Sequence, residues 1–300
     1  MTQIKSVSLR DPLEELAAGL GTSFEQTGFA VVRDHGIDPS VIAAAERAMH
    51  AFFALPEEVK RAYHQHGTGG ARGYTPFGAE HAKDAAVSDL KEFWHVGREL
   101  PPGDPLAKWM PRNVWPAEVA GFREAGLALF AAFDEAGGRL LEAIALALGL
   151  DRHFFVPTVD KGNSVMRYLH YPPVAEAAEG AVRAAAHEDI NTITLLLGAE
   201  EAGLELLTRE GEWLAVEPPQ GALVVNVGDM LQRLTAGRMR STTHRVVNPV
   251  GEAAKRSRYS MPFFLHFRPD YLIEPMGDGG EPAITAEDYL QQRLREIGLV

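Results

Sequence analysis

The first half of the chain carries apolar residues at helical spacing. A run that begins after Asp11-Pro12 has its apolar positions three or four residues apart, at Leu13, Leu16, Leu20 and Phe24. Aspartate followed by proline is typical of a helix start, so the pattern predicts a helix of about 17 residues. A short apolar run, 28–32, then predicts a buried strand.

The same spacing predicts three more helices. One begins at Asp38-Pro39 and continues to Ala54, and a shorter one begins at Pro56. The longest is expected from Pro116 to Leu148, with Gly137-Gly138 as a potential break, and it should lie along the outside of a sheet. Between these helices, alternation after Glu92 predicts a strand.

The pattern changes after Asp160 to short β-rich runs separated by turn residues. These runs are 164–171, 191–197, 203–208, 213–216, 222–227, 242–248 and 257–267. Glu210-Gly211 predicts a hairpin turn between two of them. Seven or eight short strands at this spacing are typical of a sandwich or jelly roll. A last helix is expected from Thr285 through Ile297. No linker composition separates the helical part from the β-rich part, which predicts a single catalytic unit.

Composition narrows the class of protein. The 300 residues have a net charge of -12 and include no cysteine. The acidic balance argues against nucleic acid as a partner, and the lack of cysteine excludes disulfides, thiolate metal sites and cysteine nucleophiles. The most apolar segment, 140–150, is too short to span a bilayer. The chain is therefore expected to be soluble and cytoplasmic, with no membrane partner; its oligomeric state is not determined by the sequence.

Two histidines and one carboxylate stand out in the β-rich half. His187 and Asp189 are two residues apart, and His244 lies in a separate extended run. His187 and Asp189 share a face if 187–197 forms one extended strand. Two histidines and a carboxylate with open positions form the facial triad of non-haem Fe(II) oxygenases, although catalytic zinc also uses three such ligands.

A candidate carboxylate site follows on the next apolar strand. Arg258 and Ser260 point the same way on a strand because side chains alternate. A guanidinium beside a hydroxyl suits a carboxylate. An open metal site next to an acid-binding site favours oxygenase chemistry over zinc hydrolysis.

Several segments together resemble a known family. They are 28–37, Arg167 to Pro173, His187-x-Asp189, Asn226 to Gln232, Ser241 to Val246 and Arg258-x-Ser260. In this order they resemble the isopenicillin N synthase-like family of 2-oxoglutarate- and Fe(II)-dependent dioxygenases. The resemblance covers nearly the whole chain.

The resemblance implies a mainly β fold with α. It has a double-stranded β-helix (jelly roll) core, an N-terminal helical layer and a C-terminal helix. The expected division of the chain is 1–115 as the N-terminal dioxygenase region, 116–160 as the long supporting helix, 161–270 as the jelly-roll core with the metal site, and 271–300 as the C-terminal extension and helix.

The resemblance also implies the roles of the site residues. His187, Asp189 and His244 would hold Fe(II). Arg258 and Ser260 would bind the distal carboxylate of 2-oxoglutarate, with a further contact from Tyr171. Many relatives have an asparagine two residues before that tyrosine, where this chain has Leu169. With O₂, such an enzyme oxidises, most commonly hydroxylates, a small molecule and releases succinate and CO₂.

Substrate contacts are expected from an arginine and several aromatic residues. The candidates are Arg72, Tyr74, Phe93, His95 and Phe264. Phe264 shares a strand face with Arg258 and Ser260 by alternation. If Arg72 contacts the substrate, that substrate carries a carboxylate or another anion.

The motifs are compatible with three alternatives. A zinc hydrolase could use the same ligands, and a non-catalytic β-sandwich that binds a small acid would need only the arginine. Within the family, an oxidase could use O₂ without 2-oxoglutarate. The substrate and the outcome, whether hydroxylation, desaturation or ring closure, are not encoded in these motifs.

Overall fold

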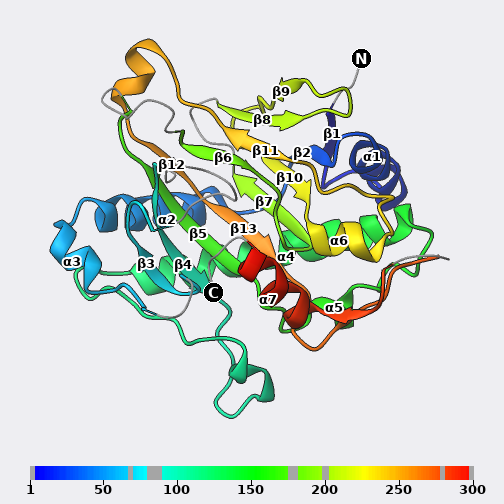
Figure 1. Cartoon of the computed structure of the whole chain (residues 1–300), viewed down its shortest axis with the longest axis horizontal. Helices are drawn as coiled ribbons and strands as arrows, with labels where there is room; N and C mark the ends of the chain where they lie inside the picture. Colours follow the sequence, from blue (N-terminus) through cyan, green and yellow to red (C-terminus); the bar gives the residue numbers. More distant parts are fainter. Residues whose placement is uncertain are drawn as a thin grey trace.

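The structure is a computed structural model that describes residues 4–66, 70–79, 90–174, 182–197, 203–277 and 281–296. Figure 1 shows a small sheet (β6, β8, β9, β11) above a larger one, with helices packed against the larger sheet. Within the described ranges no helix is both long and apolar enough to cross a bilayer.

The N-terminal helices are confirmed with small changes in their bounds. They are α1 (Leu13–Gln26), α2 (Pro39–Phe53) and α3 (Glu57–Arg61). The Asp38 carboxylate caps α2 by accepting a hydrogen bond from the Ser40 N–H at 2.7 Å. The α1 helix has no side-chain cap, and the Asp11 carboxylate accepts from Ser8 instead.

The long helix α4 (Phe122–Ala147) starts later than predicted from Pro116. Gly121, the residue before it, has a left-handed φ of 76°, which a continuous right-handed helix cannot contain. The predicted break at Gly137-Gly138 is wrong, since the helix is continuous there. A side chain on Gly137 would collide with Leu265, so glycine lets α4 approach the sheet closely.

The larger sheet contains strands from both halves of the chain. Its order is β1 (Lys5–Ser8), β2 (Phe29–Arg33), β10 (Leu223–Val227), β7 (Ile193–Leu197), β13 (Pro262–Leu265), β5 (Val165–Tyr171), β4 (Glu92–Gly97) and β3 (Gly73–Thr75), with β12 (Arg258–Ser260) also paired to β5. The predicted run 257–267 is therefore two strands, which pair with different parts of β5.

The smaller sheet has the order β6 (Ala184–His187), β11 (His244–Val246), β8 (Leu204–Leu207) and β9 (Trp213–Ala215). The predicted hairpin at Glu210-Gly211 is confirmed, because β8 and β9 pair antiparallel. The expectation of one extended strand through 187–197 is wrong. The chain leaves the small sheet after His187 and enters the large sheet at Ile193, so Asp189 lies in the crossing between them.

Short elements complete the chain. They are α5 (Val156–Val159), α6 (Asp229–Leu234), the 3₁₀ helices Pro105–Lys108 and Gly251–Lys255, the pair β14 (Leu272–Ile273) and β15 (Ile284–Thr285), and α7 (Ala286–Glu296). The predicted cap of α7 is confirmed: Thr285 and Asp288 exchange hydrogen bonds at 2.7 and 3.1 Å. Ile297, its predicted end, lies outside the described residues.

The two faces of the large sheet have different partners. On the outer face, Phe263 stacks on Phe133 of α4 at 5.4 Å, and Trp94 packs edge-on to Phe122. The inner face carries the alternate residues, among them Arg258 and Ser260. The larger hydrophobic cluster thus lies between the sheet and its helices. A second, smaller cluster, which includes Phe29, Val224 and Leu206, packs the two sheets together beside the site.

A buried charge cluster joins α3 to the outer face beside the site. The Glu92 carboxylate, 1% exposed, accepts hydrogen bonds from Lys60 Nζ at 2.7 Å and Tyr74 Oη at 2.5 Å, and His170 Nδ1 lies 2.7 Å away. Burial alone would raise the pKa of Glu92, but the hydrogen bonds from His170, Lys60 and Tyr74 hold it below its usual value.

Replacing Lys60 with methionine should lower the free energy of unfolding by about 3 kcal/mol, because it leaves a buried carboxylate with fewer partners. Arg61→Met is the matched control: its pair with Glu57 is about half exposed and should be worth less than about 1 kcal/mol. Urea titration measures both. Because the folded pKa of Glu92 is depressed, its contribution is present at neutral pH and is lost as pH falls through that pKa. Equal effects of the two substitutions would contradict this account.

Candidate metal centre and carboxylate site

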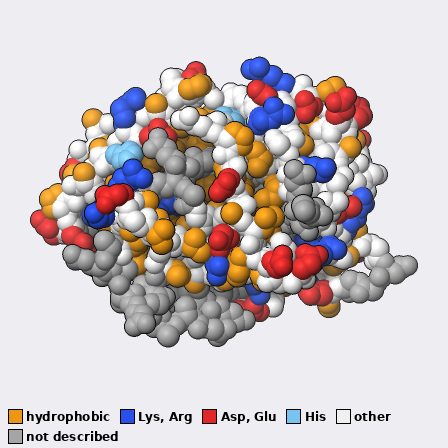
Figure 2. Space-filling view, turned by 90° about the horizontal axis from the view of Figure 1, so that it is seen from above, with side chains coloured by type: hydrophobic (Ala, Val, Ile, Leu, Met, Phe, Trp, Pro, Cys, Tyr) orange, Lys and Arg blue, Asp and Glu red, His pale blue; other side chains and the backbone are white. Residues whose placement is uncertain are grey.

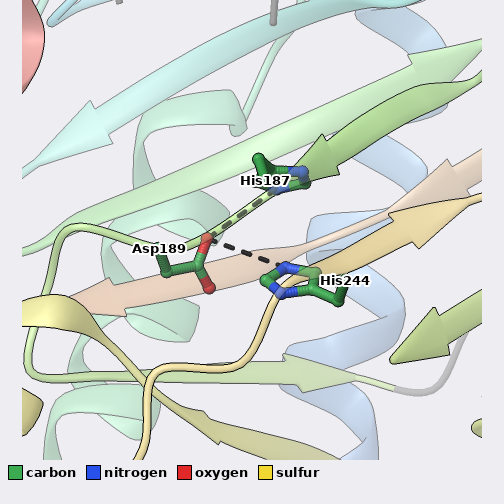
Figure 3. A group of neighbouring side chains, drawn as sticks. All are labelled: His187, Asp189 and His244. Atoms are coloured by element: carbon green, nitrogen blue, oxygen red, sulfur yellow. Dashed lines mark ion pairs between the residues drawn. The ribbon is translucent and has the colours of Figure 1, made fainter. Parts of the chain in front are cut away.

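The three predicted metal ligands converge where the two sheets meet (Figure 3). His187 ends β6 and pairs directly with His244 at the start of β11, and Asp189 follows in the crossing. Their potential ligand atoms all lie within 4.8 Å of one another. Each histidine Nε2 is 3.9 Å from Asp189 Oδ1. The spacing leaves room for one ion between three donors.

Backbone carbonyls orient both histidine rings. His187 Nδ1 is 2.8 Å from the Ala185 carbonyl oxygen, and His244 Nδ1 is 3.0 Å from that of Thr242. A carbonyl can only accept, so each ring carries its proton on Nδ1 and presents a lone pair on Nε2. That is the tautomer a metal ligand needs, and the backbone of the strand fixes it.

Two side chains of the large sheet hold the Asp189 carboxylate. Thr194 Oγ1 and Asn226 Nδ2 donate to Asp189 Oδ2 at 2.5 and 2.8 Å, which leaves Oδ1 facing the histidines. Burial would raise the pKa of Asp189, but the two histidines and these hydrogen bonds keep it low. The carboxylate is therefore ionised and already oriented as a ligand.

Burial in the site, together with the neighbouring His244, lowers the pKa of His187. About 40% of the His187 side chain is still exposed, which moderates the contribution of burial. A lowered pKa keeps the imidazole neutral, the form that binds metal.

The predicted carboxylate site lies on the inner face at one end of β5. Arg258 pairs with Tyr171 and Ser260 with Leu169, so all four side chains share this face. The Arg258 guanidinium lies 5.1 Å from the centre of the Tyr171 ring. Leu169 forms an apolar cluster with Phe93 and Tyr171. The position that carries asparagine in many relatives is therefore an apolar contact here.

The predicted substrate residues separate into two groups. Phe93, His95 and Phe264 lie on the inner face, as alternation along β4 and the pairing of Phe264 with Val165 require. Tyr74 pairs with Trp94 and lies on the outer face, where it contacts Phe52 and Glu92. That placement does not fit a substrate contact.

Both ring nitrogens of His95 have protein partners. His95 Nδ1 lies 2.5 Å from the Gly70 carbonyl oxygen, and Nε2 accepts from Arg167 Nε at 2.5 Å. The Arg167 guanidinium lies 4.0 Å from the Phe93 ring centre and 5.3 Å from that of Phe264. His95 therefore positions Arg167 between two aromatic rings.

Sequence reasoning missed four residues near the site: Thr194, Asn226, Arg167 and His266. Alternation from Ser260 through Phe264 reaches His266, so that residue could have been found. Thr194 and Asn226 lie on the paired strands β7 and β10 and act through Asp189, so only the strand order reveals them. Residues 80–89, between the candidate substrate contacts Tyr74 and Phe93, lie outside the described residues.

Two histidines and one carboxylate with open positions are the ligand set of non-haem Fe(II) oxygenases. Here the three ligands lie where two sheets meet, beside an Arg-x-Ser pair. Two family profiles match the sequence: non-haem dioxygenase in morphine synthesis N-terminal over residues 4–118, and the 2OG-Fe(II) oxygenase superfamily over residues 162–267.

Relatives of known sequence and structure agree with these profiles. The 2-oxoglutarate-Fe(II) type oxidoreductase hxnY of Emericella nidulans is 34% identical over 91% of this chain and 82% of its own length. A 2OG-Fe(II) oxygenase family protein from Caulobacter crescentus has 52% identity and a TM-score of 0.91, covering 99% of this chain and 100% of that one. A full-length Neurospora crassa protein, crystallised in complex with alpha-KG and thymine, has 29% identity and a TM-score of 0.86, covering 97% and 96%.

The chain belongs to the 2-oxoglutarate- and Fe(II)-dependent oxygenase superfamily. It is an enzyme that uses Fe(II), 2-oxoglutarate and O₂ to oxidise a small molecule. The ligand types alone leave iron and zinc open, and membership of this superfamily decides for iron. The jelly-roll prediction is confirmed by the structural neighbours.

Proposed function

We propose that His187, Asp189 and His244 hold Fe(II), and that Arg258, Ser260 and Tyr171 hold the distal carboxylate of 2-oxoglutarate. The observation that carries the first assignment is the convergence of two histidine Nε2 atoms on Asp189 Oδ1 at 3.9 Å each. The buried Arg258-x-Ser260 pair on the adjoining face supports the second.

The donor set fits the implied metal. Two neutral imidazoles and one carboxylate on one side of an ion leave the other positions open. When bound there, Fe(II) and 2-oxoglutarate supply the oxidising chemistry, with succinate and CO₂ as the products of the keto acid. The protein contributes orientation: Thr194 and Asn226 fix the carboxylate, and the backbone fixes both rings.

Arg258 fits the distal carboxylate of the keto acid because its side chain is buried with a hydroxyl on the same strand face. A charge-assisted hydrogen bond in such a place is strong and directional. It would fix the keto-acid end toward the metal ligands, which lowers the entropic cost of reaction. Hydroxylation of the substrate, and a cytoplasmic location, remain predictions.

The link from Thr194 to Asp189 can be tested by an isosteric change. Thr194→Val removes a donor to Asp189 Oδ2 and should weaken Fe(II) binding roughly 10- to 100-fold, as expected for an outer partner of a metal ligand. Thr192→Val is the control. The Thr192 hydroxyl is buried two residues away and has no hydrogen-bond partner in the described part of the chain. Anaerobic calorimetry measures both affinities, and an equal loss in the two variants would contradict the role of Thr194.

A further inference from the structure

Arg72 is a buried cation with two unused donors on the inner face of the large sheet. Its side chain is 1% exposed. Nη1 donates to the Ala71 carbonyl oxygen at 2.6 Å, whereas Nε and Nη2 have no hydrogen-bond partner among the described residues. Burial lowers the pKa of Arg72 to about 10, so the group is still charged at neutral pH. A buried cation with no counter-charge among the described residues lowers the stability of the fold, which points to an anionic ligand.

The two unused nitrogens are the pair that binds a carboxylate side-on. Nε and Nη2 share one edge of the guanidinium, and their N–H bonds run nearly parallel. The spacing of this fork matches the two oxygens of a planar carboxylate. A phosphate can also bind such a fork through two of its oxygens, whereas a single carbonyl oxygen cannot satisfy both donors. The unused edge therefore fits a ligand with two neighbouring oxygens, of which a carboxylate is the simplest.

Gly97 provides the space for the guanidinium. A Cβ at Gly97 would overlap Arg72 Cζ, Nε and Nη2. Gly97 is itself fixed by Asn113, which exchanges two hydrogen bonds of 2.8 Å with its backbone N–H and carbonyl. The position of Arg72 over the end of β4 is thus built into the strand.

His266 lies at the same end of the sheet. Gly97 pairs with Val165, Val165 pairs with Phe264, and the backbone N–H of His266 donates to Ser164 Oγ at 3.2 Å. Its Nδ1 lies 3.0 Å from the Phe264 carbonyl oxygen, which leaves Nε2 as an acceptor. Burial lowers the pKa of His266 to about 4, and the charges of Asp189 and Arg72 shift that pKa in opposite directions, so His266 lies within electrostatic range of both.

Arg72 and the proposed 2-oxoglutarate site lie at opposite ends of β5. Arg258 is at the Tyr171 end and Arg72 at the Val165 end, six residues or roughly 20 Å apart along the strand. A five-carbon keto acid is too short to reach both guanidinium groups. Arg72 therefore requires a different carboxylate.

We propose that Arg72 binds the carboxylate of the molecule that this enzyme oxidises, so that the substrate is a small organic acid. The proposal rests on the proposed function of the metal and keto-acid sites. His266 Nε2 is placed to accept a hydrogen bond from a hydroxyl or amino group of that acid. The Phe93–Arg167–Phe264 stack lines the same face and suits the apolar part of the substrate. Figure 2 shows acidic and basic side chains interspersed on the surface. The inner face of the large sheet, in contrast, carries Arg72, Arg167 and Arg258.

The first test asks whether Arg72 stabilises the fold when no substrate is bound. Arg72→Met keeps the length of the side chain and removes an unpaired buried charge, so it should raise Tm by about 2 °C or more in the anaerobic protein with Fe(II) and 2-oxoglutarate. Arg98→Met is the matched control, because Arg98 is bidentate with Asp134 at 2.7 and 2.9 Å and its loss should lower Tm. A fall in Tm for Arg72→Met would show a structural partner and overturn the proposal.

The second test uses acetate as the smallest carboxylate probe. In wild type with Fe(II) and saturating 2-oxoglutarate under anaerobic conditions, about 100 mM sodium acetate should raise Tm by about 2 °C over sodium chloride of equal ionic strength. Acetamide should not, and Arg72→Met should lose the acetate effect. No acetate shift in wild type, or an equal shift in Arg72→Met, would contradict the assignment.

The affinity for 2-oxoglutarate separates this proposal from the one on which it rests. Arg72→Met should leave the Kd of 2-oxoglutarate within about threefold of wild type, whereas Arg258→Met should not. If Arg72→Met instead abolishes 2-oxoglutarate binding, Arg72 belongs to the keto-acid site and both assignments fail. If only the acetate effect is absent, the metal and keto-acid sites stand and the substrate class does not.

Discussion

Replacing His187 with alanine is expected to weaken Fe(II) binding by more than the roughly 10- to 100-fold that loss of an outer partner causes. The side chain supplies one of three donors, and two remaining donors cannot hold the ion against water. The His187 ring should contribute little to the stability of the fold, because its side chain is 40% exposed and Nδ1 is hydrogen-bonded to a backbone carbonyl two residues away. Tm of the metal-free variant should therefore stay close to that of metal-free wild type. Anaerobic calorimetry with Fe(II) measures the affinity.

Arg245→Met is the control for this change. Arg245 neighbours His244 on β11 but points away from the site, where it pairs with Glu205 at 2.8 Å and lies over the Trp213 ring. Its loss should leave Fe(II) affinity unchanged. Retention of wild-type affinity in His187→Ala would remove that residue from the ligand set.

Replacing Arg258 with methionine is expected to weaken 2-oxoglutarate binding while Fe(II) binding changes little. Removing one partner of a buried, charged hydrogen bond costs roughly 2–5 kcal/mol, which corresponds to about 30-fold to several thousandfold in Kd. Ser260→Ala removes one hydrogen bond from a neutral hydroxyl to the carboxylate and should cost about 10- to 100-fold. Titration of 2-oxoglutarate into anaerobic protein with Fe(II) gives both values. A parallel loss of Fe(II) and 2-oxoglutarate affinity in Arg258→Met would mean that the substitution disturbs the fold, and the assigned role would fall.

The sequence predicted the elements well where a single period governs them. The helix at Leu13–Gln26 and the strand at Glu92–Gly97 follow directly from apolar spacing. The start of α4 was predicted too early because Gly121 interrupts the helical backbone, and glycine in a sequence does not reveal its φ. Gly137 was read as a break because its close contact with Leu265 is a tertiary effect.

The candidate site was predictable to a different extent for each kind of residue. His187, Asp189 and His244 could be named from their chemistry, but the reason they meet is different from the one expected. Asp189 is brought in by a crossing between two sheets and not by a continuous strand. Tyr74 was misplaced because the residues before β3 gave no register, and its pairing with Trp94 decides its face. His266 was within reach of alternation, whereas Asn226 depends on the order of the strands.

The central claim is that His187, Asp189 and His244 hold Fe(II) beside a keto acid fixed by Arg258. It is tested most directly by visible absorption of the anaerobic protein with Fe(II) and 2-oxoglutarate. Wild type should develop a weak charge-transfer band that requires both additions, and Arg258→Met should need far more 2-oxoglutarate to reach it. His187→Ala should show no band at the same concentrations. Absence of the band in wild type, or its survival in His187→Ala, would contradict the account.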